Sequence, residues 1–293
     1  MNRNTTAIST FVKESLSLFA IPSLQRAKGI LLLIVIPTIL FPFIAQADVD
    51  EIMKRGKLIV GLPTSEQKPF FSKDKNGKLV GIDIDLARLI AHELHVELEL
   101  VQPHASWDDT VQDVADGNTD LAISYVSITP MRSMKVMFSR PYSSVRPVFV
   151  LNRQFIAKAQ SEGLYTLGAI FNGPKYPIGL LADSSYKEIA DKILPNASKH
   201  NDPDTTKQVL ANQSAGYLTD EMDAVAIFLD HPEYKLPLIN YAYKDYLDNI
   251  GVPVSYKNPK LLELVNNILQ SNKIFYTMDD LILILSRTNE TPK

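Results

Sequence analysis

The sequence of 293 residues contains no cysteine. Disulfide bonds, thiol catalysis and thiolate metal sites are therefore excluded, as is a lipid-modified cysteine at a signal cleavage point. Low-complexity tracts are also lacking. Hydrophobic residues make up 45% of the chain, which is enough for a substantial core, and the length suggests one large or two medium-sized domains.

One long hydrophobic run occurs near the start of the chain. Residues 30–44 are almost entirely apolar, follow Arg26 and Lys28, and precede the small-x-small sequence A-Q-A at residues 45–47. This order is typical of a secretory signal peptide, and the run is short for a membrane span. We predict a signal peptide at residues 1–47 and a periplasmic protein, which would be tethered to the membrane if the signal is not cleaved.

Basic residues are slightly outnumbered, since 30 Lys and Arg oppose 33 Asp and Glu, for a net charge of −3. Four of the basic residues but only one of the acidic residues precede residue 48. The remainder of the chain is therefore more acidic than the whole. This balance argues against nucleic acid as a partner, because proteins that bind phosphate backbones carry basic patches.

Histidine is scarce as well, with five residues in the whole sequence. The segment H-E-L-H at residues 92–95 is one residue short of the zinc-binding pattern H-E-x-x-H. No pattern of carboxylates accompanies it, as a histidine-based metal site would require. We therefore predict no metal site and no cofactor.

Hydrophobic periodicity predicts alternating strands and helices in the first half of the chain. This order implies a parallel sheet with helices on its faces, and in such sheets ligands bind beyond the carboxyl ends of the strands. The predicted elements are a strand at 58–61, a turn at 74–77, a helix from Asp83 to about His95, a strand at 96–100, a helix at 107–116 and a strand beginning at Leu121.

A second α/β unit is predicted after a weakly patterned segment, 152–175, that follows extended residues 145–151. Its second element begins with a capping box, in which a serine and a glutamate three residues later satisfy each other's backbone N–H groups. The predicted elements are a strand at 178–182, a helix from Ser185-x-x-Glu188 to Leu194, a helix at 204–212, strands at 223–229 and 251–256, a helix at 259–269 and a last helix near 278–285.

The segment from Leu121 to Tyr142 combines a buried strand with residues suited to binding an anion. Thr129 can cap a short helix that starts with proline, a residue that needs no N–H at this position. Arg132 would lie in the first turn, where the helix already carries positive partial charge. A cation there suits a bound anion, so Arg132, the Ser127 hydroxyl and free backbone N–H groups are predicted to form a carboxylate clamp.

Three segments of the sequence resemble one family closely. They are G-K-L-V-G-I-D-I-D-L-A at residues 77–87, D-L-A-I-S-Y-V-S-I-T-P-M-R at residues 120–132 and F-S-R-P-Y at residues 138–142. These segments are similar to the family 3 extracellular solute-binding proteins, the polar amino-acid receptors of ABC importers. The resemblance is specific from about residue 57 to 150, weaker as far as residue 229 and vague beyond it.

The resemblance implies an α/β protein with the two-lobed type II periplasmic binding protein fold. Each lobe would be a mostly parallel sheet flanked by helices, and two strands would join the lobes. Lobe 1 would comprise residues 48–150 and 244–293, and lobe 2 residues 151–243. The lobes would close on a small amino acid or related carboxylate, and the protein, expected to be a monomer, would deliver it to an ABC permease in the inner membrane.

Ligand contacts are also implied by the resemblance. Arg132 and Ser127 would bind the ligand α-carboxylate, Trp107 would pack on the ligand, and Ser124 or the backbone near Tyr125 would meet the amine. Serines at the start of a lobe 2 helix would close over the carboxylate. The expected ligand-binding residues are Gln67, Trp107, Ser124, Tyr125, Ser127, Arg132, Ser184, Ser185 and Asp230.

Several positions depart from the family pattern. Gln67 stands where a second stacking aromatic is common, Asp183 where glycine is common, and Tyr125 replaces a small residue. The lobe 2 acid that pairs with the ligand ammonium usually lies five residues after a strand aspartate, but counting from the aspartate at 223 gives phenylalanine. Either a bulge brings Asp230 to the ligand or this partner is missing. Asp183 and Asp230 could serve a cationic side chain, and Gln67 an amide.

Each of these residues also has a structural alternative. Arg132 could neutralise a surface carboxylate, Trp107 could belong to the core, Ser127 and Ser185 could be ordinary helix caps, and Asp230 a solvated turn residue.

Three functions follow from the resemblance. The first is the transport receptor. The second is an enzyme, because a periplasmic cyclohexadienyl dehydratase uses the same fold and needs a general acid in the cleft, although no catalytic pattern is recognisable here. The third is a ligand-sensing module, which is usually fused to an output domain. We predict the receptor, with no catalytic residues.

Overall fold

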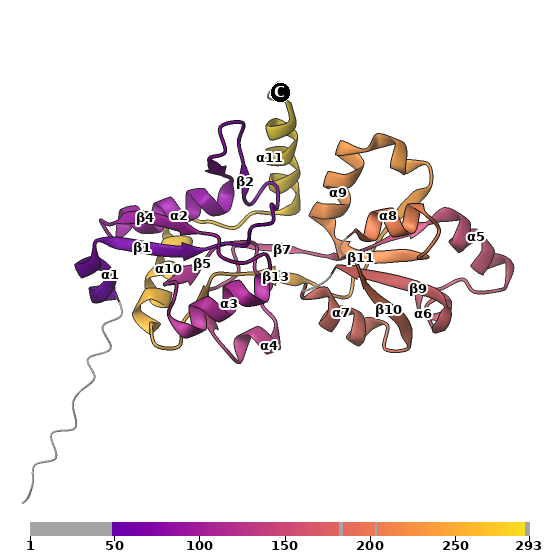
Figure 1. The fold of residues 1–293 in the computed structure, drawn as a ribbon, viewed down its shortest axis with the longest axis horizontal. Helices are drawn as coiled ribbons and strands as arrows, with labels where there is room; N and C mark the ends of the chain where they lie inside the picture. Colours follow the sequence, from indigo (N-terminus) through magenta and orange to yellow (C-terminus); the bar gives the residue numbers. More distant parts are fainter. Residues whose placement is uncertain (1–48, 182–183, 203, 291–293) are drawn as a thin grey trace, which may run out of the picture. The chain divides into compact units, whose positions relative to one another are not determined.

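The computed structural model describes residues 49–181, 184–202 and 204–290 (Figure 1). All of the described residues belong to one compact unit. The predicted signal peptide and Asp183 lie outside the described residues. In the described ranges, no helix is both long and apolar enough to cross a membrane.

The first sheet has five strands in the order β4-β1-β5-β14-β6. Strand β1 pairs in parallel with β4 and β5, whereas β14 pairs antiparallel with β5 and β6. Strand β14 comes from the C-terminal part of the chain, so two distant segments build one sheet. The strands are β1 (Lys57–Gly61), β4 (Glu97–Val101), β5 (Leu121–Ala122), β6 (Met137–Phe138) and β14 (Pro253–Val254).

The helices of this part confirm the periodicity-based predictions. The Ser106 hydroxyl caps α3 by accepting from two backbone N–H groups, and left-handed Gly117 ends it. The Thr129 hydroxyl caps α4, which begins at Pro130 as predicted. The helices are α1 (Val49–Arg55), α2 (Ile82–Glu93), α3 (Trp107–Asp116), α4 (Pro130–Ser133), α10 (Pro259–Ser271) and α11 (Met278–Glu290), and a small hairpin joins β2 (Ser72–Lys73) to β3 (Leu79–Val80).

The second sheet also has five strands, in the order β10-β9-β11-β8-β12. Strands β9, β10 and β11 are parallel, and β8 runs antiparallel to β11 and β12. Its strands are β8 (Pro147–Asn152), β9 (Gly173–Leu181), β10 (Ala197–Asp202), β11 (Gly216–Asp220) and β12 (Leu238–Ala242). Its helices are α5 (Arg153–Ser161), α6 (Leu167–Ile170), α7 (Tyr186–Ile193), α8 (Thr205–Leu210), α9 (Glu221–Asp230) and the 3-10 helix η1 (Pro232–Lys235).

Two short strands link the sheets along the chain. Strand β7 (Ser143–Val145) follows β6 and precedes β8, whereas β13 (Asp248–Ile250) follows β12 and precedes β14. They pair antiparallel with each other as a separate two-stranded ribbon (Figure 1). The chain therefore leaves the first sheet and returns to it through neighbouring strands.

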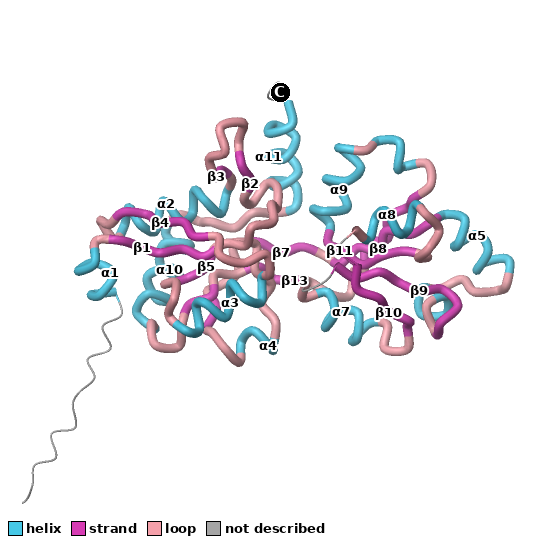
Figure 2. Tube along the Cα trace, viewed as in Figure 1, coloured by secondary structure: helices cyan, strands magenta, loops and turns pink. Residues whose placement is uncertain are grey.

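The prediction of a strand at 223–229 was wrong, because these residues form helix α9 (Figure 2). The strand lies earlier, at β11, and was missed. A short apolar run does not distinguish a strand from a buried helix segment. Asp220 ends the strand and caps the helix, since its carboxylate accepts from the Asp223 backbone N–H at 2.9 Å. An aspartate followed by acids in the next turn is itself a helix-start signal.

The predicted capping box at Ser185 was also wrong. Ser185 has helical backbone angles and makes no side-chain cap bond at the start of α7. Its hydroxyl instead contacts the Ser127 hydroxyl at 2.9 Å. The predicted strand at 251–256 is reduced to the two residues of β14.

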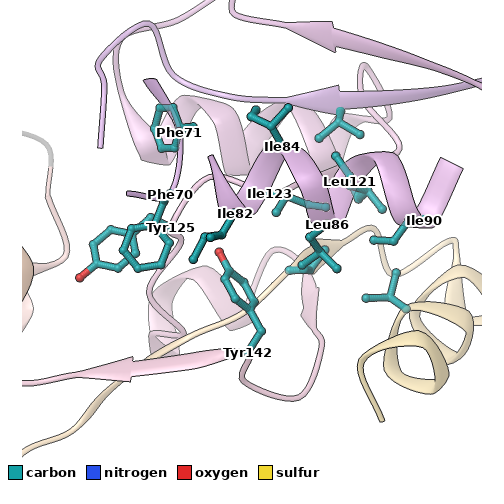
Figure 3. Packing of buried hydrophobic residues seen from close by; sticks show 14 of the residues in the cluster. Phe70, Phe71, Ile82, Ile84, Leu86, Ile90, Leu121, Ile123, Tyr125 and Tyr142 are labelled. Atoms are coloured by element: carbon teal, nitrogen blue, oxygen red, sulfur yellow. The ribbon is translucent and has the colours of Figure 1, made fainter. Parts of the chain in front are cut away.

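A fully buried carboxylate organises the core beneath the loop after β5. Asp83 accepts hydrogen bonds from the Tyr125 backbone N–H at 2.7 Å and from the Tyr142 hydroxyl at 2.9 Å. Tyr125 has φ of 56°, a left-handed conformation that costs free energy for a bulky residue. Its ring packs on Phe70 with 4.0 Å between centroids (Figure 3). Asp83 therefore holds Tyr125 in a backbone conformation that it would rarely adopt alone.

Replacing Asp83 with alanine is expected to lower the free energy of unfolding by about 2–4 kcal/mol. The change leaves a buried N–H and a buried hydroxyl without an acceptor, and each such group costs about 1–3 kcal/mol. Urea denaturation measures the loss. The matched control is Asp85→Ala on the same helix, whose exposed partner is Arg88, and whose loss should stay below about 1 kcal/mol. Equal losses in the two variants would contradict the assigned role of Asp83.

Candidate functional site

A cavity that is partly open to solvent is lined by residues that follow or precede strands of both sheets. Seven of the nine predicted ligand-binding residues line it, and Ser124 and Asp230 do not. The lining residues are Gln67, Trp107, Tyr125, Ser127, Arg132, Ser184, Ser185, Tyr186, Leu218, Thr219, Asp220 and Asp223.

Arg132 is buried and fixed from two sides. Its Nε donates to the Asp108 carboxylate at 2.9 Å, and its Nη1 donates to the Ser127 carbonyl oxygen at 3.2 Å. The Asp108 side chain is 58% exposed, so a carboxylate near solvent pairs with a guanidinium that lines the cavity. Arg132 therefore pairs with a surface carboxylate, as the structural alternative expects, and also lines the cavity, as a carboxylate clamp would.

A chain of hydroxyl and carboxylate groups lies beside Arg132. The Ser127 hydroxyl donates to the Asp248 carboxylate at 2.8 Å. The Ser185 hydroxyl lies 2.9 Å from the Ser127 hydroxyl. A hydroxyl has one hydrogen, so Ser185 donates to Ser127 when Ser127 donates to Asp248. This bond connects the loop after β5 with the start of α7. Burial raises the pKa of Asp248 to about 6, and hydrogen bonding to Ser127 opposes this rise.

Asp220 is the most buried carboxylate in the cavity wall, with 2% of its surface exposed. Burial raises the pKa of Asp220 well above its usual range, and the nearby charge of Asp223 raises it further. Burial therefore favours the protonated form of Asp220 more than solvent would. Sequence reasoning missed this residue because it placed the strand after Asp220 rather than before it.

Asp223 lies three residues further on, in the first turn of α9. One of its carboxylate oxygens accepts from Gln67 Nε2 at 2.7 Å, and the other accepts from the Thr219 hydroxyl at 2.8 Å. Gln67 is itself fixed by two backbone bonds with Phe71, each 2.8 Å long. The Gln67–Asp223 bond therefore joins a rigid loop near the first sheet to the helix that follows β11.

Two buried tyrosine hydroxyls in the cavity wall lie beside carboxyls. The Tyr125 hydroxyl lies beside Asp220 and the Tyr186 hydroxyl beside Asp248, and each favours the ionised form of its neighbouring carboxyl. Burial raises the pKa of both phenols well above 10. Both are therefore neutral, and each can donate to its carboxyl and accept from a ligand.

Trp107 and Ser124 interact with each other. The indole Nε1 donates to the Ser124 carbonyl oxygen at 2.8 Å, which orients the ring at the edge of the cavity. Ser124 is fully buried, and its hydroxyl has no partner among the described residues. Ser124 therefore positions Trp107 and does not line the cavity.

Asp230 does not belong to this site. It is the last residue of α9 and is exposed. Nine helical steps of about 1.5 Å separate Asp230 from Glu221, the first residue of α9, which is a distance of roughly 13–14 Å. The prediction that a bulge brings it to the ligand depended on a strand at 223–229, and that strand is a helix.

Two sheets of five strands with flanking helices, linked by two strands and sharing one charged cavity, define a bilobal α/β binding-protein architecture. The chain belongs to the bacterial extracellular solute-binding proteins, family 3, whose sequence model matches residues 58–282. The fold is the type II periplasmic binding protein fold, as solved structures that resemble it also have. This confirms the predicted family and fold class.

Individual relatives agree with this assignment. The chain is 26% identical to the arginine-binding periplasmic protein of Mannheimia haemolytica over 70% of its own length and 81% of that protein. It is 34% identical to cyclohexadienyl dehydratase of Pseudomonas aeruginosa over 33% of its length and 35% of that protein. The chain thus spans only 35% of the length of this dehydratase and 51% of the length of another of the first curated relatives. A Streptococcus pneumoniae amino-acid ABC transporter substrate-binding protein, solved bound to L-arginine, is 27% identical, with TM-score 0.64 and coverage of 81% of this chain and 96% of that one.

Proposed function

We propose that this protein binds an amino acid in the cavity between two lobes in the periplasm and delivers it to an ABC permease. Lobe 1 carries the first sheet and lobe 2 the second, and β8 (Pro147–Asn152) pairs with β11 and β12, so the first crossing lies a few residues before the predicted boundary at residue 151. The observation that supports the proposal is that Arg132, from lobe 1, and Asp220 and Asp223, from lobe 2, line the same cavity.

The two charged sides match the two charged groups that every amino acid carries. A guanidinium has five N–H groups, and Arg132 uses two of them for Asp108 and the Ser127 carbonyl, so further N–H groups remain for a ligand carboxylate. The ligand ammonium would meet Asp220, and the hydroxyl oxygens of Tyr125 and Tyr186, which lie beside Asp220 and Asp248, could accept from it.

Closure of the lobes supplies the transport signal in this proposal. Two hydrogen bonds already cross between the lobes, from Gln67 to Asp223 and between Ser127 and Ser185. A ligand that binds both lobes stabilises the closed state relative to the open state, because only the closed state offers both sets of contacts. The closed monomer would then dock on the permease in the inner membrane.

A thermal-shift screen of the twenty amino acids and common metabolites tests the proposal. One or a few amino acids should raise the melting temperature, because a ligand at 100 times its dissociation constant stabilises the folded state by about 2.7 kcal/mol. The mature chain without the signal segment is the sample. If no amino acid shifts the melting temperature at millimolar concentration, the proposed function is wrong.

A second candidate is dehydratase activity, which one observation favours. Burial raises the pKa of Asp220, and a carboxyl with a raised pKa that lines the same cavity as Arg132 could act as the general acid that a dehydration needs. Incubation with prephenate or arogenate would then form an ultraviolet-absorbing product, and Asp220→Asn would abolish it. Absence of product with both compounds leaves the binding function alone.

A further inference from the structure

Asp223 is a second acid in the cavity that the proposed contacts to the amino-acid backbone do not use. Its side chain is half-buried, and each of its oxygens accepts one hydrogen bond from a neutral donor, Gln67 or Thr219. A carboxylate can accept about four hydrogen bonds, so both oxygens retain capacity for a further donor. Among the described lining residues, Arg132 is the cation, and its two hydrogen bonds go to Asp108 and Ser127.

The charges in the cavity wall favour a ligand that carries net positive charge. Once a ligand ammonium favours the ionised form of Asp220, Asp220 and Asp223 line the cavity against one cation, Arg132, which already pairs with Asp108. A further carboxylate, Asp248, bonds Ser127 just behind the wall. An ordinary amino acid adds one negative and one positive group, so it leaves this excess of acid unchanged. A ligand with one more cationic group offsets it, which lowers the cost of keeping these carboxylates away from water.

Gln67 indicates which kind of ligand atom suits Asp223. Its Nε2 is a planar N–H donor 2.7 Å from the carboxylate, and it reaches across from the loop that precedes β2. A guanidinium or ammonium group presents the same kind of donor with an added charge, and hydrogen bonds between charged partners are about twice as strong as neutral ones. Trp107 lines the same cavity and offers a flat apolar surface for the methylene groups of a long side chain.

We propose that Asp223, together with Gln67 and Thr219, forms the side-chain subsite of this cavity and selects an amino acid whose side chain ends in a positively charged nitrogen. This inference rests on the proposed amino-acid-binding function. Asp223 is the specificity-determining residue. Gln67 Nε2 bonds Asp223 at the position that the ligand nitrogen would take or share. A neutral amide side chain is the alternative occupant, because it could donate to Asp223 and accept from Gln67.

Pairs of ligands that differ in charge but hardly in shape distinguish these occupants. Calorimetric titration of the wild-type protein compares L-arginine with L-citrulline and L-lysine with L-norleucine. The charged member of at least one pair should bind about 10–100-fold more tightly, as expected when one charge-assisted hydrogen bond is lost. In Asp223→Asn, which keeps an acceptor for Gln67, the preference should fall to about threefold or less, with neutral ligands little changed.

Asp230→Asn, at the exposed end of the same helix, is the matched control and should retain the wild-type preference. The inference would be overturned if the wild type bound citrulline as tightly as arginine and norleucine as tightly as lysine. This comparison uses the wild type alone, so it does not depend on the folding of a variant. An undiminished preference in Asp223→Asn would overturn it as well. If neutral amino acids bind in an Arg132-dependent way without a charge preference, only the subsite assignment fails. If no amino acid binds the wild type, the proposed function itself fails.

Discussion

Replacing Arg132 with alanine is expected to lower the affinity for the amino-acid ligand at least about 30-fold and to abolish the thermal shift. Removing one partner of a buried, hydrogen-bonded charge pair costs about 2–5 kcal/mol, and each 1.4 kcal/mol is a factor of ten. The ligand carboxylate would be left in the cavity beside Asp248 and Asp108 without its cation. Calorimetric titration with the ligand identified by the screen measures the loss.

Two further variants separate the clamp from general effects of charge. Arg132→Lys keeps the charge but loses the planar fork, and its affinity should fall between those of the wild type and the alanine variant. Arg140→Ala removes an exposed arginine that bonds Gln270 and is absent from the cavity wall, so its affinity should be unchanged. Circular dichroism checks that the unliganded Arg132→Ala protein is folded. A folded Arg132→Ala protein with near wild-type affinity would falsify the assignment of Arg132 as the clamp.

Ligand binding is expected to release a proton from Asp220, and Asp220→Asn is expected to weaken binding by a similar factor of about 30 or more. Burial and the neighbouring Asp223 raise the pKa of Asp220, which favours its protonated form. A ligand ammonium favours the ionised carboxylate and lowers this pKa. Affinity should therefore increase as the pH rises through the raised pKa of Asp220, because fewer protons remain to be displaced.

Titrations in buffers with different ionisation enthalpies measure the proton directly. The wild type should release protons on binding, whereas Asp220→Asn should release fewer, with any remainder from Asp248, whose raised pKa is about 6 and which bonds Ser127 behind the cavity wall. Asp204→Asn is a matched control, because Asp204 also caps a helix and asparagine caps equally well. Equal proton release by wild type and Asp220→Asn would show that another group titrates.

The same pKa shift determines how Asp220 affects folding. A carboxyl whose pKa is raised in the folded state binds more protons there than in the unfolded chain. Its contribution to the free energy of unfolding is therefore present at low pH and is lost as the pH rises through the raised pKa. Asp220→Asn should flatten this part of the pH profile of the unliganded protein.

Local signals along the chain were enough to predict the capped helix start that carries Arg132. Thr129, Pro130 and Arg132 lie within four residues of one another, and their roles as cap, first helical residue and cation follow from the backbone groups at a helix start. The alternation of strands and helices up to Leu121 could be predicted for the same reason, because periodicity of 2 or 3.6 residues depends only on neighbours.

The acidic side of the cavity could not be predicted in this way. An apolar run after Asp223 suits either a strand or a buried helix, and its packing decides which one forms. Helix α9 contacts α11 from the other end of the sequence, as well as β8 and β11. Once the strand was misplaced, Asp220 was missed and Asp230 was chosen in its place.

What the sequence determined by itself is the set of segments whose structure depends on near neighbours: most of the strands and helices, the capped turn around Arg132, and the family. Only the tertiary structure decided which side chains share the cavity. Asp220 and Asp223 reach Gln67 and Tyr125 across about 100 to 150 residues of chain. Such contacts form because burial of distant apolar faces brings these segments together, and no local pattern records that burial.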